Sequence, residues 1–273
     1  MDEKKRASKT KRRAGRLFRL LLFLMILGLG WYAYELGIPG LVLEWAEERG
    51  DSGRTVEERE RVLLDVPYLN QDELGYPAGC EMTAALMALE QEGIDLTAEE
   101  FLSYLPMEEV YEKGGKMWGP DPGKSFAGNP ASSSGYGCFA PVIREALKSV
   151  ILDKGDPSLA VSDLTGSTLE ELKEEIDRGI PVILWASSGM KEITYRDSWY
   201  IEGKTTPYFW PQGEHCLLLI GYQGDYLFFH DPQGEAEVAY HRDEVQGPYR
   251  ELGQQALAIY LSLIHISEPT RPE

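Results

Sequence analysis

Residues 214–232 read EHCLLLIGYQGDYLFFHDP, and this stretch decides which fold the chain is expected to adopt. Its two apolar runs, His215–Tyr222 and Asp225–Asp231, are separated by a short turn segment, which predicts an antiparallel hairpin. Two further apolar runs bounded by Gly or Pro, Ile180–Ala186 and Ala256–Tyr260, are also strand-like. The second half of the chain is therefore expected to form an antiparallel sheet.

The register of this hairpin decides whether His215 and Asp231 share a face. A three-residue loop, Gln223–Asp225, pairs Tyr222 with Tyr226 and makes the two polar residues diagonal neighbours on one face. A two-residue turn would put them on opposite faces. A shared face therefore requires the odd loop or a bulge.

Upstream of the sheet the sequence has helical periodicity. A Gly-Cys pair at residues 79–80 opens the first predicted helix, and Ser167-Thr168 and Gly179 frame the last one with start and stop signals. Helices followed by strands are typical of an α+β fold. The expected elements are a short strand at Val66–Gln71 and helices at Met82–Glu92, Thr97–Leu105, Phe139–Leu152 and Thr168–Arg178.

A long polar segment lies between these helices. Residues 106–137 contain GPDPGKSFAGNPASSSGYG, which is too poor in apolar periodicity for regular elements and too long for a simple connection. We expect this segment to shape a binding cleft and substrate specificity. Asp121 within it is interpreted as a turn residue and not as a metal ligand.

The chain is acidic. Its 273 residues hold 27 Lys and Arg against 45 Asp and Glu, a net charge of −18, which argues against a nucleic-acid partner. It contains no phosphate loop or dinucleotide-binding fingerprint, and no Cys or His spacing typical of a zinc site. We therefore expect neither a cofactor nor a metal.

The N-terminal residues predict a membrane anchor. A basic tail at residues 1–16 precedes a 20-residue apolar stretch at 17–36, and a charged, mainly acidic stalk follows at 37–61. The stretch is long enough for one bilayer crossing, and the basic flank keeps the N-terminus cytoplasmic. The folded part is then extracytoplasmic. A cleaved signal peptide is the alternative, although no A-x-A-like site follows.

The folded domain is expected to span residues 62–260. The tail that follows it, residues 261–273, resembles the translation of a sequencing-library adapter, so it is interpreted as non-native. His265 in this tail is given no functional role.

Cys80 is the candidate nucleophile because it opens a predicted helix, where unpaired N–H groups and the helix dipole favour a thiolate. His215 is the candidate base and Asp231 its orienting partner. The Cys80 N–H and the Gln71 side chain are the candidate oxyanion donors, with Asn70 the second choice because it points to the other face of its strand.

The remaining cysteines and histidines receive structural interpretations. Cys216 points into the core if the hairpin has the register above, and it forms either a disulfide with Cys138 or one of two buried thiols. His230 and His241 are interpreted as surface or supporting groups, because His230 points to the face opposite Asp231 and His241 lies in HRDEV with no apolar frame around it.

Seven segments occur in the order of one known family. The segments are VPYLNQ, YPAGCEMTAALMAL, DPGKSFAGNP, GYGCFAPVI, GIPVILW, EHCLLLIGY and FFHDP. With them the sequence resembles the bacterial C-39-like (bacteriocin-processing or double-glycine peptidase-like) group of papain-like cysteine peptidases over about residues 64–260.

The resemblance implies a papain-like α+β fold in which Cys80, His215, Asp231 and Gln71 are nucleophile, base, orienter and oxyanion donor. The spacing between Gln71 and Cys80 is longer than in peptidases that process double-glycine leaders, and no transporter or ATPase region accompanies the domain, so leader cleavage is not implied. The expected partner is a peptide or protein substrate, including cell-wall peptides, and the oligomeric state is left open.

Three functions fit these residues. The leading hypothesis is an extracytoplasmic, membrane-anchored cysteine peptidase that works through an acyl-enzyme. A peptidoglycan stem-peptide amidase or transpeptidase would use the same chemistry. A non-catalytic papain-like module that binds peptides is the alternative outside the enzymes.

Overall fold

The structure is a computed structural model that describes residues 61–154 and 158–261. It has the α+β fold that the sequence predicts. The predicted tail at 1–16, the membrane helix at 17–36, and all but the last residue of the stalk lie outside the described residues, as do residues 262–273 of the C-terminal tail. None of the helices that the structure describes is long and apolar enough to cross a bilayer.

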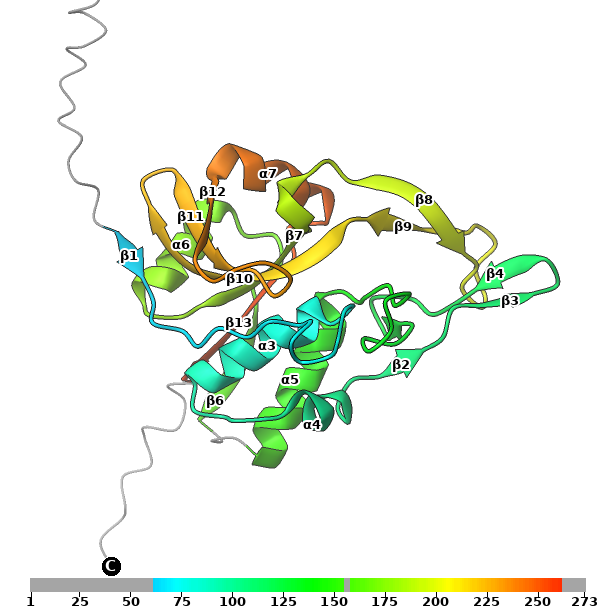
Figure 1. Ribbon diagram of the computed structural model, residues 1–273, viewed down its shortest axis with the longest axis horizontal. Helices are drawn as coiled ribbons and strands as arrows, with labels where there is room; N and C mark the ends of the chain where they lie inside the picture. The colour runs from blue at the N-terminus through cyan, green and yellow to red at the C-terminus, as the bar shows by residue number, and fades with distance from the viewer. Residues whose placement is uncertain (1–60, 155–157, 262–273) are drawn as a thin grey trace, which may run out of the picture. The chain divides into compact units, whose positions relative to one another are not determined.

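A seven-stranded antiparallel sheet forms the centre of the described domain, with β1 pairing β10 beside the strand path β12-β11-β10-β7-β13-β6 (Figure 1). Strand β10 is the longest of the described strands and pairs with three neighbours, and seven of its ten residues are buried. The strands are β1 (Val62–Leu63), β6 (Leu159–Asp163), β7 (Val182–Ser187), β10 (Glu214–Gln223), β11 (Tyr226–His230), β12 (Val238–His241) and β13 (Ala256–Leu261).

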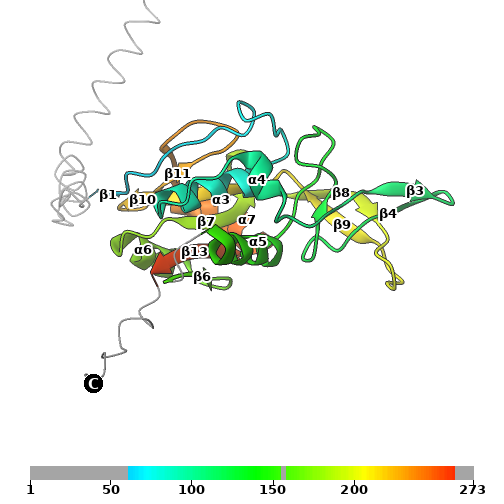
Figure 2. The same ribbon diagram turned by 90° about the horizontal axis from the view of Figure 1, so that it is seen from below.

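Helices cover both faces of this sheet (Figures 1 and 2). Cys216 and Leu218 of β10 belong to the core under α3, α4 and α5, whereas Leu217 and Leu219 belong to the core under α6 and α7. The alternation follows from the period of two residues in a strand. The helices are α3 (Cys80–Gln91), α4 (Ala98–Leu102), α5 (Ala140–Lys154), α6 (Leu169–Asp177) and α7 (Arg242–Glu251).

The β10–β11 hairpin has a different loop from the predicted one. Gln223 pairs with Tyr226, so the turn has two residues instead of three. The ladder is interrupted between Leu219 and Gly221, where Ile220 forms a bulge. The two-residue turn alone would put His215 and Asp231 on opposite faces of the hairpin. The extra residue at Ile220 reverses this, so the two side chains still share a face. Hydrophobic periodicity does not reveal such a bulge.

Three other predictions about elements were wrong in whole or in part. Val66–Gln71 forms no strand. Single hydrogen bonds hold this segment in place instead, such as the one that the Gln71 N–H donates to the Pro232 carbonyl at 2.8 Å. The helix expected at Thr97–Leu105 is limited to α4, which Thr97 caps. The region after Gly179 is not all strand, because α7 begins after His241 and tolerates an internal proline.

The long segment at 106–137 contains short strands where none was expected. Together with the β8–β9 hairpin, the β3–β4 hairpin extends away from the central sheet, and both views place the two side by side (Figures 1 and 2). A cluster of buried aromatic side chains includes Trp199 of β8, which is stacked on Trp210 of β9. The strands are β2 (Met107–Glu108), β3 (Tyr111–Lys113), β4 (Lys116–Trp118), β5 (Phe126–Ala127), β8 (Thr194–Trp199) and β9 (Tyr208–Gln212).

Candidate active site

Cys80 is the first residue of α3, as the sequence predicts, and only 7% of its surface is exposed. Gly79 precedes it at the N-cap, where a Cβ atom would lie 2.9 Å from Cβ of Tyr76. A larger residue would therefore displace the turn that delivers the cysteine. Helix α3 packs against β10, so this turn lies next to the strand that carries His215.

His215 and Asp231 meet across the hairpin. Their Nε2 and Oδ1 atoms are 2.6 Å apart, and both residues are buried. Burial alone would raise the pKa of the Asp231 carboxyl, but the hydrogen bond and charge of His215 and the backbone N–H groups of Gln233 and Gly234 lower it overall. Asp231 is therefore held as a carboxylate beside the imidazole.

The turn after β11 is fixed in place by Tyr68. Its hydroxyl donates to the carbonyl oxygens of Asp231 at 3.0 Å and Gly234 at 2.8 Å. The ring also packs edge-on against His230, 5.3 Å between centroids. The segment that was expected to be a strand therefore supports Asp231, the candidate orienter.

Gln71 is buried, with 2% of its surface exposed. Its Nε2 donates to the carbonyl of Pro77 at 2.8 Å, in the loop that leads to Cys80, while its Oε1 is buried and has no hydrogen-bond partner among the described residues. Asn70 has another use, since its Oδ1 accepts from the N–H groups of Asp72 and Glu73. Of the two amides, Gln71 is the one that contacts the loop before the cysteine.

The thiol environment differs from the expected one. Cys80 Sγ donates to Oε2 of Glu81 at 3.3 Å, and not to His215. Burial, followed by the charges of Glu81 and Glu214, raises the pKa of Cys80 well above its ordinary value. The prediction that the helix N-terminus would favour a thiolate is therefore wrong for this state, because desolvation and two carboxyl groups outweigh the helix dipole.

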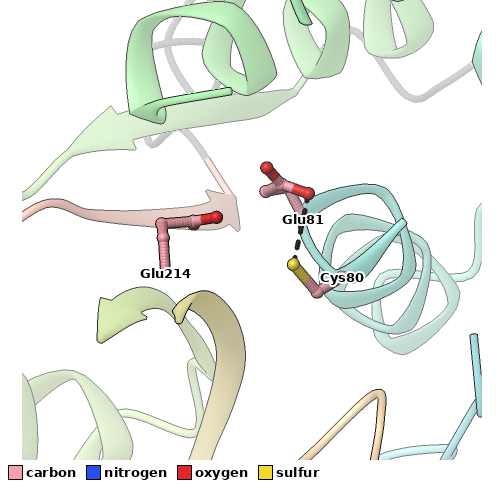
Figure 3. A group of neighbouring side chains, drawn as sticks. All are labelled: Cys80, Glu81 and Glu214. Atoms are coloured by element: carbon pink, nitrogen blue, oxygen red, sulfur yellow. Dashed lines mark hydrogen bonds between the residues drawn. The ribbon is translucent and has the colours of Figure 1, made fainter. Parts of the chain in front are cut away.

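Glu81 and Glu214 are the site residues that sequence reasoning missed (Figure 3). Each is adjacent in sequence to a predicted catalytic residue, and the structure brings one atom of each to within 4.8 Å of Cys80 Sγ and of each other. The raised pKa of Cys80 disfavours the thiolate that Zn²⁺ binds, so this grouping is not assigned as a metal site. Their positions directly after Cys80 and before His215 were the available signal.

The remaining cysteines and histidines are now placed. Cys138 and Cys216 are free and buried, which matches the second of the two alternatives for them. His230 is not on the surface: its Nε2 is 2.8 Å from the Val66 carbonyl. His241 accepts from the Asp243 N–H at 3.3 Å and caps α7. Both histidines therefore have structural roles.

Asp121 is a turn residue, as expected. Its carboxylate accepts from the Gly123 N–H at 3.0 Å, and its carbonyl accepts from the Lys124 N–H. The turn contributes to the long segment without pointing to a ligand.

Fold and sequence both resemble those of C-39-like proteins. A crystal structure of a protein described as a C-39-like peptidase from Bacillus anthracis superimposes with a TM-score of 0.63 at 24% identity, covering 74% of this chain and 98% of that one. The uncharacterized protein YvpB of Bacillus subtilis (strain 168) is 27% identical over 198 residues, 72% of this chain and 75% of its own. The model of the Peptidase_C39 like family matches residues 63–257, and the chain belongs to this family.

Proposed function

We propose that the chain is a cysteine peptidase in which Cys80 is the nucleophile, His215 the base and Asp231 the orienter. The observation that carries the proposal is the 2.6 Å contact between His215 Nε2 and Asp231 Oδ1, beside the helix that begins with Cys80. A base fixed by a carboxylate next to a cysteine at a helix start is the arrangement that thiol acyl transfer needs.

Because Asp231 occupies Nε2 of His215, Nδ1 is the ring nitrogen that takes the thiol proton. As Sγ of Cys80 bonds to the substrate carbonyl carbon, its proton moves to Nδ1. Collapse of the tetrahedral intermediate breaks the C–N bond, and the imidazolium returns the proton to the leaving amine. Water, deprotonated by the same imidazole, then hydrolyses the thioester and restores the thiol.

The raised thiol pKa favours this coupled proton transfer over a preformed thiolate. The oxyanion is held by the backbone N–H of Cys80 and by the Gln71 amide. The contact of Gln71 with Pro77 supports this role, because it fixes the amide to the loop that carries the cysteine.

The substrate class is peptides or proteins, and the site of action is the extracytoplasmic face of a membrane. The basic tail, apolar stretch and acidic stalk of residues 1–61 support this location. Cell-wall peptides would be accessible there, so hydrolysis of a stem peptide is included in the proposal.

One observation favours a non-catalytic peptide-binding module instead. The Cys80 thiol donates to Glu81, and a buried cysteine held in this way resembles a structural thiol. Peptide binding without turnover would then be the function of the same site.

Turnover of a peptide library and of muropeptides by the full chain separates these functions. We expect cleavage by the wild type and none by Cys80→Ala or His215→Ala, with both variants still binding the cleaved peptide. Binding by all three proteins without any cleavage would support the module and contradict the peptidase. Asp95→Asn, at an exposed position before α4, is the matched control.

A further inference from the structure

Two carboxyl groups lie beside the proposed nucleophile, and the proposed reaction does not use them: Glu81 is buried, and Glu214 is half-buried with its Oε1 atom enclosed. Glu81 comes from the first turn of α3, and Glu214 comes from the start of β10 (Figure 3). They belong to different elements, so their meeting is a property of the tertiary fold. Figure 3 shows the Glu214 side chain extending toward Glu81.

The two carboxyl groups differ in the hydrogen bonds that they accept. Glu81 accepts twice, from the Cys138 N–H at 2.6 Å and from the Cys80 thiol at 3.3 Å. Oε1 of Glu214 is buried and has no hydrogen-bond partner among the described residues. A buried carboxylate oxygen without a donor is costly, whereas a protonated carboxyl is much less so.

The titratable groups that face this pair come from four parts of the fold. Among the described residues, His215 of β10 is the basic side chain whose charge acts on Glu81. No lysine or arginine of the described residues is among the main groups that shift the pKa of either acid, so their repulsion is not neutralised by a fixed cation. The other facing groups are Cys80 of α3, Cys138 before α5, Cys216 of β10 and Tyr208 of β9.

Two carboxyl groups this close cannot both ionise at ordinary cost. Burial, more than any other cause, raises the pKa of Glu81 to about 7 and that of Glu214 well above its ordinary value. Glu81 is stabilised as an anion by its two donors, whereas the described part of the chain supplies no donor to Glu214. One proton on the pair is therefore expected near neutral pH, and it resides on Glu214.

We propose that Glu81 and Glu214 share one proton across this carboxyl pair, and that Glu81 is a positioning residue that sets the pH at which the Cys80 thiol becomes reactive. The proposal rests on the proposed function, since it takes Cys80 as the nucleophile.

The same pair connects the nucleophile to the long segment at 106–137. The backbone of Cys138, directly after that segment, is held at both ends: its N–H donates to Glu81, and its carbonyl accepts from Trp185 Nε1 at 2.9 Å. A Cβ atom on Gly137 would lie 2.5 Å from Oε1 of Glu81 and 3.0 Å from Oε2 of Glu214. The charge of the pair therefore acts on the thiol and on the base of the loop together.

The test measures the rate at which Cys80 of the full chain is alkylated as a function of pH. Glu81→Gln keeps an acceptor for the Cys138 N–H but removes the charge next to Sγ. Unit charges 3.3 Å apart interact by about one pH unit even at the dielectric constant of water, so we expect the midpoint of the Cys80 profile to fall by about one unit or more. A purely structural role would lower the rate at every pH and leave the midpoint in place.

The shared proton has a readout that needs no reactive thiol. Infrared spectroscopy of the wild type at about pH 8 should show the band of a protonated carboxyl group, and Glu214→Gln should lack that band. Glu174→Gln, at an exposed position on α6, is the control for both measurements.

The outcomes separate the two proposals. An unmoved midpoint in Glu81→Gln, or the absence of the wild-type band, overturns the carboxyl pair. Alkylation of Cys80 that does not change in His215→Ala overturns the proposed function, while the infrared band still decides whether the pair holds a proton.

Discussion

Replacement of Asp231 should slow the reaction of Cys80 by an amount that can be worked out from the His215 contact. Both residues are buried and their facing atoms are 2.6 Å apart, so solvent screens the interaction weakly. A hydrogen bond to a charged group contributes about 1.5–3 kcal/mol, against roughly 1 kcal/mol for a neutral one. Asp231→Asn keeps the bond and loses the charge, a difference of about 0.5–2 kcal/mol.

These energies convert to rates at about 1.4 kcal/mol per factor of ten. Asp231→Asn should therefore slow alkylation roughly 2–30-fold near neutral pH, and Asp231→Ala roughly 10–150-fold, because the imidazolium then lacks its partner. The assay is the second-order rate of iodoacetamide reaction at Cys80 in the full chain, resolved by peptide mass spectrometry. Asp95→Asn is again the control.

The critical result is the order of the alkylation rates, with the wild type fastest, Asp231→Asn slower and Asp231→Ala slowest. Equal rates in the wild type, Asp231→Asn and Asp231→Ala would show that the carboxylate does not act on the base, and the reasoning from the 2.6 Å contact would be refuted. A circular dichroism spectrum and a melting temperature for each variant identify any loss caused by unfolding.

Three further outcomes follow from the site. Gln71→Ala should lower kcat roughly 100-fold and change KM little, because an oxyanion donor acts in the transition state, and a change confined to KM would contradict this. The lowered pKa of Asp231 contributes stability that is present above its unfolded pKa of about 3.9 and lost as pH falls through its folded value, so melting temperatures should show this loss in the wild type but not in Asp231→Asn. A chelator should leave turnover of the purified full chain unchanged, and a loss restored by Zn²⁺ would instead assign a metal to Cys80, Glu81 and Glu214.

Much of the fold could be predicted because its signals are local. The apolar run of β10, the cap of α6 at Thr168 and the helix opening at Cys80 are all in the structure where the sequence indicates them. Helix α7 was missed, since its polar composition and internal proline resemble a loop, and its stability depends on burying Val245 and Tyr249 against the sheet. Tertiary packing decides such elements.

The candidate site could be predicted only in part. The contact between His215 and Asp231 was predicted, but from the wrong loop length. In the structure a bulge at Ile220 puts the two residues on one face, and hydrophobic periodicity cannot reveal a bulge. The thiol environment could not be predicted, because the charge next to Cys80 comes from Glu81 and from Glu214, 133 residues apart in the sequence. Their meeting requires α3 to pack on β10.

Site-resolved alkylation of the full chain tests the central claim most directly. After brief iodoacetamide treatment near neutral pH, we predict that Cys80 carries the label in the wild type, that Cys138 and Cys216 stay unmodified because they are fully buried, and that His215→Ala labels Cys80 much more slowly. Equal, slow labelling of Cys80 in the wild type and in His215→Ala would contradict a nucleophile activated by His215.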